Sequence, residues 1–406
     1  MELSSIQGLW TCKFNLLSTL AIASLLYYLG ATLVARTAWL RRFAIPVPAV
    51  GGLLFALLAL FLHRQVNVTV DTTLRAPLQV AFFTTIGFGA TVQLLRSGGR
   101  TLLLFWAIAT GTGVLQNIVG IATAKGVGAP PLLGIICGAV TLTGGPATGL
   151  AFTETFEKLG VAGAGSLIMA SATFGIFVAS LIGNPVACAL IRRLRIPVPS
   201  PQNGASLPGP PQSTPHMTAG SLMHNLIVLL AVMGVGTGLG MAVQGMGYVL
   251  PAFIFPMIIA AILRLTDDRR GWLRLDAAAM ETLGFLSLNF FLVIALMDLK
   301  LWQLAGLALP MLVILGLQTL TTAAYAVLTT FLLLGRDYEA AVATSGHIGF
   351  GMGITPNAVA NMQALVARFG PAPRSFLVIP VVGAFFIDLT NSLVITLFIN
   401  ISGNAG

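Results

Sequence analysis

The sequence carries very little charge: only 8% of its 406 residues are Asp, Glu, Lys or Arg, whereas 56% are hydrophobic. Soluble domains normally contain about 25% charged residues, so this composition excludes an ordinary soluble protein. A net charge of +9 would by itself suggest a nucleic-acid-binding protein. In so apolar a chain, basic residues in short loops instead set the orientation of membrane-spanning helices, and we prefer that interpretation.

Cysteine is also scarce. The three cysteines, Cys12, Cys137 and Cys188, are an odd number and lack the spacing of a metal site. Two of them fall in apolar segments, where a free cysteine behaves as a small hydrophobic residue. The N-terminus also lacks the basic cluster of a cleavable signal peptide, because only Glu2 and Lys13 are charged before the first apolar run. We therefore expect that run to remain in the mature protein.

Long apolar segments dominate the chain, and their lengths fit the roughly 20 residues that span a bilayer as a helix. Five lie in each half, which predicts an all-α membrane protein with ten transmembrane helices. They run near 14–35, 46–62, 77–95, 101–124 and 162–190, and then near 221–243, 249–263, 278–297, 301–334 and 375–400. A cytoplasmic linker at 196–219, rich in Pro, Ser, Gln and Gly, is predicted between a first repeat, 1–195, and a second, 220–406.

The two halves match each other at several positions. Leu115-Gln116-Asn117 corresponds to Leu317-Gln318-Thr319, and Thr143-Gly144-Gly145 corresponds to Ser345-Gly346-His347 at the same offset. Because five crossings are an odd number, the second repeat is predicted to be inverted relative to the first. With both termini outside, 15 of the 21 basic residues fall in cytoplasmic loops, which supports this orientation.

One further apolar stretch in each half, at 130–159 and 340–369, is interrupted by glycines. In the first, Pro146 favours a helix start directly after Gly144-Gly145. That helix would end near Leu159 and would be roughly 21 Å long, which is too short for a hydrocarbon core of about 30 Å. The segment is therefore predicted to be a re-entrant hairpin.

The second stretch repeats this pattern. An irregular, glycine-rich run is predicted from Thr344 to Gly353, followed by a helix with Thr355 as N-cap and Pro356 as its first residue. Gly370-Pro371 then ends that helix after Phe369. This segment is also predicted to be a re-entrant hairpin.

Broken helices at matching positions of two repeats predict a secondary transporter and its binding site. Irregular backbone at membrane depth is tolerated where it lines a cavity, and glycine amides and helix N-termini can bind an anion there. The alternative is that these glycines only allow close helix packing. The predicted substrate-binding residues are Thr141, Thr143, Gly144, Gly145, Thr148, Gly149, Ser345, Gly346, His347, Gly349, Gly351, Thr355, Asn357 and Asn361. For His347, a structural role is equally compatible with the sequence.

Asp388 is the clearest acidic residue within a predicted span, where a charge costs at least about 2.5 kcal/mol on insertion scales. It is expected to bind a cation or a substrate ammonium group, the alternative being a protonated Asp that joins two helices. Carboxamide oxygens also suit Na⁺, although they equally hold helices together. The Na⁺ candidates are Asp388, Asn391, Gln116, Asn117 and Gln318. No catalytic residue and no cofactor besides this coupling ion is expected.

With these residues identified, the chain resembles the bacterial sodium/glutamate symporter family over nearly its whole length. The resemblance rests on ordered blocks at 45–53, 81–87, 141–149, 295–302, 346–351, 355–364, 368–371 and 382–391. It implies Na⁺-coupled import of L-glutamate by an inner-membrane homodimer that moves a transport domain against a scaffold, in the manner of an elevator. Ala147 and His347 depart from the family's glycine pattern in the two loops.

Three other functions remain open. A transporter of the same fold could carry another organic anion, such as a dicarboxylate or a hydroxycarboxylate. A channel could also contain matched re-entrant loops. A membrane-embedded enzyme would need paired acids or a His, Cys, Asp and Glu constellation at membrane depth, and the sequence offers one such acid and one candidate His. An enzyme is therefore not expected.

Overall fold

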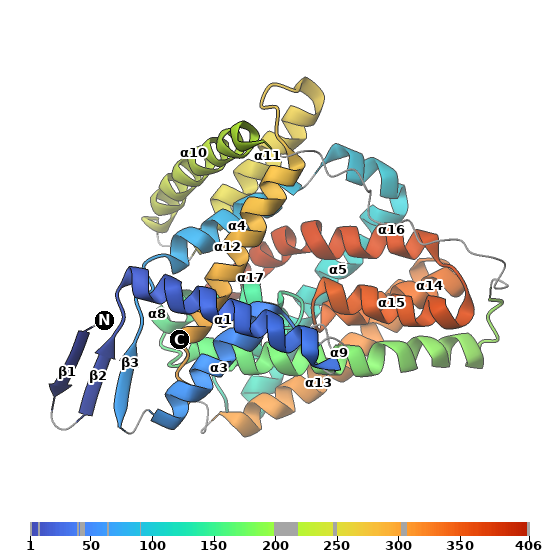
Figure 1. The fold of residues 1–406 in the computed structure, drawn as a ribbon. Coiled ribbons are helices and arrows are strands. Elements are labelled where there is room, and N and C mark those ends of the chain that lie inside the picture. Colours follow the sequence, from blue (N-terminus) through green and yellow to red (C-terminus); the bar gives the residue numbers. More distant parts are fainter. Residues whose placement is uncertain are drawn as a thin grey trace.

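The protein is almost entirely helical (Figure 1). The computed structural model describes residues 2–6, 9–38, 40, 45–62, 65–89, 91–198, 218–246, 250–301 and 307–403. Most of the predicted linker, 199–217, therefore lies outside the described residues. A small sheet, which the sequence analysis did not predict, is formed by β1 (Glu2–Ile6), β2 (Leu9–Lys13) and β3 (Val66–Thr69). Strand β2 pairs antiparallel with β1 and parallel with β3.

The two halves contain the same succession of helices. The first half holds α1 (Leu16–Arg36), α3 (Val47–Leu62), α4 (Arg75–Gly89), α5 (Val92–Gly126), the broken segment α6 (Pro131–Ile135), η1 (Ile136–Val140), α7 (Gly145–Ala151) and α8 (Thr153–Lys158), and then α9 (Ala164–Arg193). The second half holds α10 (Ala219–Gln244), α11 (Ile254–Arg270), α12 (Ala277–Met297), α13 (Ala308–Ala326) with η3 (Val327–Phe331), the broken segment α14 (Tyr338–Gly351) and α15 (Thr355–Phe369), and then α16 (Pro373–Val381), η4 (Val382–Phe386) and α17 (Ile387–Gly403).

Each of the ten predicted spans contains a helix, but not every helix is long enough to cross a bilayer. Within the described residues, seven apolar stretches reach that length: Leu16–Arg36, Gly99–Gly126, Ala164–Arg193, Ala219–Gln244, Ala277–Met297, Ala308–Phe331 and Pro373–Ser402. Helices α3, α4 and α11 have only 16, 15 and 17 residues. At 1.5 Å per residue they are shorter than a hydrocarbon core of about 30 Å. The expectation of ten full spans is thus met in part.

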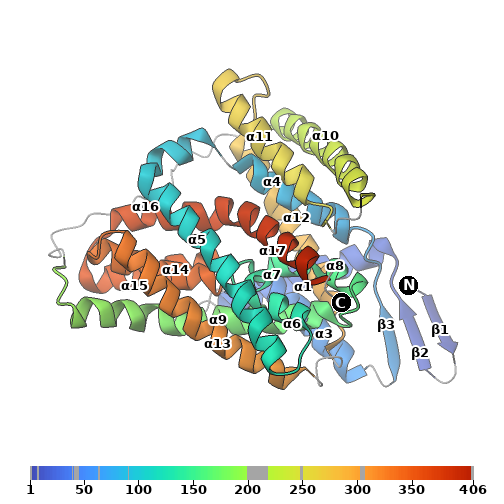
Figure 2. The same ribbon diagram turned by 180° about the vertical axis from the view of Figure 1, so that it is seen from behind.

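The helices form two groups that pack mainly among themselves. The first group, here called the panel, contains α1, α3 and α4 from the first half and α10, α11 and α12 from the second. The second group, here called the block, contains α5 to α9 and α13 to α17. Figures 1 and 2 show the panel helices α4, α10, α11 and α12 on one side of the molecule and the block helices α13 to α16 on the other. The first three helices of each half therefore lie in the same group.

The two chain ends lie at the same end of the molecule, close to α8, in both views (Figures 1 and 2). Two halves that each cross the membrane the same odd number of times would place the two chain ends on the same side. We call this end the terminal face. The position of the termini relative to a bilayer remains a prediction.

The first break is close to the predicted one. The chain leaves the helix at Gly138, makes a turn over Thr141–Gly144, and re-enters a helix at Gly145 with Pro146 in its first turn. Gly145 has φ +66°, which a residue with a side chain adopts only under strain. The predicted single helix from Pro146 to Leu159 is wrong in one respect, because Phe152 separates α7 from α8.

The second break is much shorter than predicted. Helix α14 continues regularly to Gly351, so the irregular run expected from Thr344 is wrong, and the break is confined to 352–354. Packing explains the glycines: a Cβ at Gly349 would lie 2.5 Å from Cα of Ala358, and one at Gly346 would lie 2.6 Å from Sδ of Met362. These two glycines let α14 and α15 approach closely, as the packing alternative required. The helix start at Thr355 and its end at Phe369 agree with the prediction to within one residue.

This packing generates a stability prediction. Gly349→Ala should lower the thermal unfolding temperature in detergent, because the added methyl group overpacks the α14–α15 contact, at a typical cost of about 1–3 kcal/mol. Gly234→Ala on α10 is the matched control, because a Cβ there meets no atom within 4 Å. The control should leave stability unchanged or raise it, since Ala favours a helix interior. Equal unfolding temperatures for the two variants would contradict this packing.

Candidate functional site

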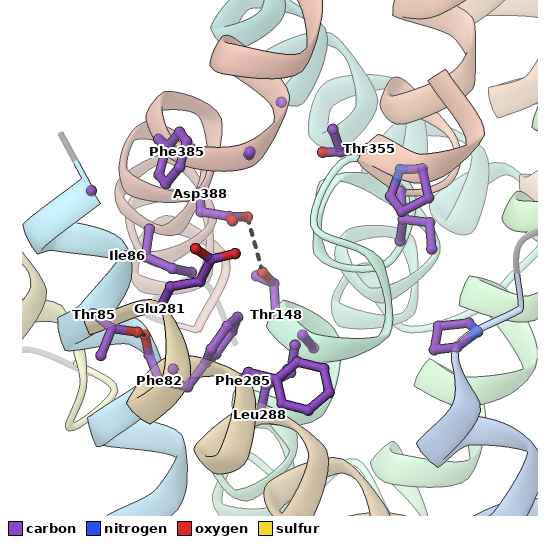
Figure 3. A pocket seen from close by; sticks show the side chains of 18 of the residues that line it. Phe82, Thr85, Ile86, Thr148, Glu281, Phe285, Leu288, Thr355, Phe385 and Asp388 are labelled. Atoms are coloured by element: carbon purple, nitrogen blue, oxygen red, sulfur yellow. Dashed lines mark hydrogen bonds between the residues drawn. The ribbon is translucent and has the colours of Figure 1, made fainter. Parts of the chain in front are cut away.

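A cavity of about 820 Å³ lies between the panel and the block. Its panel wall comes mainly from α4 and α12, and its block wall comes from the two breaks and from the η4–α17 region. Figure 3 shows this interior, with Phe82, Thr85 and Glu281 facing Thr148, Thr355 and Asp388 across the space. The cavity therefore lies where the two breaks meet the segment formed by η4 and α17.

The two breaks contact each other beside the cavity. A Cβ placed on Gly145 would lie 3.0 Å from Cγ2 of Ile354, so the first turn of α7 lies directly against the second break. Gln116 on α5 links the two breaks. Its Nε2 donates to the carbonyl of Gly351 at 2.7 Å, and its Oε1 accepts from Oγ1 of Thr143 at 2.7 Å. Gln116 is fully buried, so it satisfies polar groups that a regular helix would otherwise have paired.

Asp388 places a carboxylate in the cavity. It lies two residues after the π-helical segment η4, and Pro380 lies two residues before that segment. Such π-bulges occur often at functional sites, because they rotate the following side chains relative to a regular helix. Oγ1 of Thr148 donates to Oδ1 of Asp388 at 3.5 Å, which is a long hydrogen bond (Figure 3). The carboxylate thus keeps capacity to bind a cation.

A cluster of buried carboxamides surrounds the first break. Nδ2 of Asn391 donates to the carbonyl of Ala139 at 2.9 Å, and Oδ1 of Asn117 accepts from the amide of Ala139 at 3.3 Å. Gln318 donates to the carbonyl of Gln116. Within the described part of the chain, Oδ1 of Asn391 and Oε1 of Gln318 are buried and accept no hydrogen bond. Unpaired buried oxygens are costly, and oxygen is the ligand type that a hard cation takes, so these two atoms are candidate cation ligands.

The comparisons with known proteins agree with this architecture. The family model described as sodium/glutamate symporter matches residues 12–371. The sodium/glutamate symporter of Escherichia coli strain K12 is 41% identical over 395 residues, which cover 96% of this chain and 98% of the relative. That of Haemophilus influenzae is 38% identical over 390 residues, which cover 93% and 96%. The chain belongs to the sodium/glutamate symporter family.

This symporter family membership, together with the long apolar helices, makes the chain a multi-pass protein of the bacterial inner membrane. Among solved structures, the sodium proton antiporter MjNhaP1 from Methanocaldococcus jannaschii aligns over 96% of this chain and 98% of its own, at 15% identity and a TM-score of 0.44.

The structure divides the predicted substrate residues of this family member into two sets. Thr143, Gly144, Thr148 and Thr355 line the cavity. The others lie outside the lining: Thr141 bonds to Ser171, Ser345 to Asn184, Asn357 to Ser180, and Asn361 to the carbonyl of Ala179. Gly349 packs against the backbone of α15, whereas Gly145, Gly149, Gly346 and Gly351 face side chains of neighbouring segments.

His347 belongs to the second set and lies away from the cavity lining. Its Nε2 is 2.8 Å from Oγ1 of Thr112 and its Nδ1 is 2.6 Å from Oγ1 of Thr330. Its ring also stacks on Phe350, with centroids 5.4 Å apart. Both ring nitrogens are therefore engaged within the block, as expected for the structural alternative.

Sequence reasoning missed the panel side of the site. Glu281 on α12 and Arg264 on α11 both line the cavity, and the Glu281 side chain points into it (Figure 3). A signal was present for Glu281, because it is an acidic residue within the apolar run predicted at 278–297. No comparable signal marks Phe82 or Thr85, since only tertiary packing turns these residues toward the cavity.

The role of Gln116 leads to a second prediction. Gln116→Leu should destabilise the protein by about 1 kcal/mol or more, because it removes the two 2.7 Å hydrogen bonds to the Gly351 carbonyl and from the Thr143 hydroxyl. Only the longer bond of 3.4 Å between that hydroxyl and that carbonyl would remain. Thr319→Val is a suitable control, since among the described residues its hydroxyl bonds only to the carbonyl of Leu315 within its own helix. Thermal unfolding followed by intrinsic fluorescence would compare them. If Gln116→Leu unfolds at the wild-type temperature, Gln116 does not hold the two breaks together.

Proposed function

We propose that this protein imports L-glutamate together with Na⁺ by secondary active transport, and that the substrate binds in the cavity between the panel and the block. The observation that carries the proposal is the meeting of both helix breaks with Asp388 at one cavity. Membership of the sodium/glutamate symporter family supports the choice of substrate and coupling ion.

Glutamate presents two carboxylates and one ammonium group. The N-terminal turn of α15 supplies the amide of Thr355, which no capping side chain occupies, and Thr355 and Pro356 line the cavity. Pro356 has no N–H, and the amide of Asn357 donates to the carbonyl of Ile354. The dipole of a helix N-terminus also attracts anions. The hydroxyls of Thr148 and Thr355 add hydrogen-bond donors, and Asp388 binds the ammonium group or Na⁺. The predicted residues outside the lining act by shaping the two breaks.

Sodium binding is proposed at the carboxamide cluster and at Asp388. The free oxygens of Asn391 and Gln318 are buried beside the break at Ala139, and Asn117 and Gln116 complete the cluster. Because these ligands also hold the first break, Na⁺ binding would order the substrate site, which is a direct physical route to coupling. Transport of two or more Na⁺ per anion would be electrogenic and driven by about 2.3 kcal/mol per charge per 100 mV.

Alternating access is proposed to occur by movement of the block relative to the panel, with inverted repeats and an elevator-like displacement. Few elements join the two groups: α7 contacts α12, α17 contacts α11 and η4 contacts α4. The cavity lies along this same boundary. The two breaks lie in the block, so a substrate held between them would travel with it. A homodimer remains an expectation from the family resemblance.

A second candidate is a symporter of the same fold for a different organic anion. Ala147, which stands where the family's loop pattern has glycine, is one of the residues that line the cavity. A methyl group at this point reduces the space beside the first break. This change favours a substrate of different length or shape from glutamate.

The proposed substrate is tested by uptake of radiolabelled L-glutamate into proteoliposomes, with and without an inward Na⁺ gradient. Accumulation above equilibrium only with the gradient is expected, because the Na⁺ gradient drives the substrate. Protein-free liposomes are the control. Absence of glutamate uptake, combined with Na⁺-driven uptake of malate, citrate or aspartate, would favour the second candidate.

The role of Asp388 is tested in the same vesicles. Asp388→Asn should raise the Na⁺ concentration for half-maximal uptake by about tenfold or more, because a neutral amide replaces a charged cation ligand and hydrogen bonds or contacts to charged groups are worth about 1.5–3 kcal/mol. Asp71→Asn, in the segment before α4, is the control and should keep the wild-type Na⁺ dependence. Unchanged Na⁺ dependence in Asp388→Asn would mean that Asp388 does not bind the ion.

A further inference from the structure

The cavity stops short of the terminal face. On α4 its lining extends from Gly89 back to Phe82, and on α12 it extends from Ala277 to Leu292. Arg75, at the start of α4, and Asp298, directly after α12, lie one to two turns beyond these limits. The residues around Arg75 therefore decide whether the cavity is closed at this end.

Two panel side chains bind the end of α7 there. Nη2 of Arg75 donates to the carbonyl of Leu150 at 3.1 Å, and Nε2 of Gln79 donates to the carbonyl of Ala151 at 3.1 Å. Arg75 and Gln79 are four residues apart on α4 and so share one face. The two carbonyls belong to the last turn of α7, two and three residues after Thr148, which lines the cavity. The panel thus holds the C-terminal end of the first break.

The panel itself orients the Arg75 side chain. Nη1 of Arg75 lies 3.9 Å from Oδ2 of Asp298, and the Arg75 side chain is only 17% exposed. Burial raises the pKa of the Asp298 carboxyl, and the positive charge of Arg75 opposes that rise. Both residues belong to the panel, so Arg75 remains positioned by its own group while its second nitrogen reaches the block.

An aromatic contact closes the same place. Phe152, which directly follows α7, is fully buried with its ring 5.6 Å from that of Phe253 at the start of α11. Phe253 in turn stacks on Phe83 of α4 at 4.1 Å. Phe152 belongs to the block, whereas Phe83 and Phe253 belong to the panel. Polar and apolar contacts between the two groups therefore meet at the end of α7.

We infer that the hydrogen bonds of Arg75 and Gln79 hold the end of α7 against the panel and so close the cavity at the terminal face. These bonds set how readily the cavity opens at that face. The inference rests on the proposed alternating access. Neither residue belongs to the cavity lining, so they govern the conformational step rather than substrate affinity. In the open state, water would replace them as the partner of the Leu150 and Ala151 carbonyls.

Loss of these two hydrogen bonds should shift the equilibrium between the closed and open states toward the open state. Two hydrogen bonds from Arg75 and Gln79 favour the closed state, and removal of both donors should therefore raise the open population about tenfold or more. The concentration of glutamate for half-maximal uptake should change less than the maximal rate. Because loss of folded protein also lowers the maximal rate, rates are compared per amount of folded protein.

Cysteine accessibility tests the inference without need of transport. In a background with Cys12, Cys137 and Cys188 replaced by serine, Ala147→Cys places a reporter in the cavity wall. A membrane-impermeant maleimide is applied to sealed vesicles of each orientation. In Arg75→Met/Gln79→Met, the labelling rate from the terminal face should rise about tenfold over the background protein, in line with the population shift. Gln79→Met alone should give a smaller rise, and it serves if the double variant does not fold.

Arg374→Met is the matched control. Nη2 of Arg374 also donates to a carbonyl, that of Leu334 at 2.9 Å, and pairs with Asp337 at 3.2 Å, but these partners all belong to the block. Equal labelling rates in the double variant and in Arg374→Met would show that Arg75 and Gln79 do not close the cavity. If labelling changes as expected while the wild type fails to import glutamate, the role of Arg75 and Gln79 in closing the cavity is supported and the proposed substrate is wrong.

Discussion

Inside a bilayer, every backbone amide and carbonyl that leaves a helix needs a partner from the protein, because the hydrocarbon offers none. Both helix breaks of this chain depend on that constraint. Gln116 satisfies the carbonyl of Gly351 and the hydroxyl of Thr143, while Asn117 and Asn391 bind the amide and the carbonyl of Ala139. The breaks persist at depth because one buried layer of carboxamides pairs with them.

The same constraint ties the site to the arrangement of the whole molecule. The block buries the breaks, whereas the panel covers them on one side only and leaves the cavity between. A ligand in this cavity therefore contacts backbone that the block holds and side chains, such as Glu281, that the panel presents. Displacement of one group against the other would change the second set of contacts and keep the first. This division makes movement between the groups compatible with an intact binding site.

Several charged residues lie at the boundary between the two groups. Asp388 faces the cavity from the block, and Arg75 reaches across at the terminal face to hold the end of α7. Elsewhere the contacts between panel and block are apolar, as between Phe152 and Phe253. Apolar contacts permit sliding because they have little directionality, whereas hydrogen bonds select one position. The polar contacts are thus the ones that distinguish one conformation from another.

The amino-acid sequence by itself determined the membrane class, the place of the helices, the two breaks and the family. These features follow from composition, segment length and local residues such as Pro146 and Gly145, which act within a few positions along the chain. Only the tertiary structure decided which candidates face the cavity. Gly346 and Gly349 serve helix packing, and His347 bonds within the block, although their positions match Gly145 and its neighbours in the first repeat. The small sheet, the panel wall with Glu281, and the contact of Arg75 with Leu150 likewise depend on residues far apart in the sequence, whose juxtaposition no local pattern encodes.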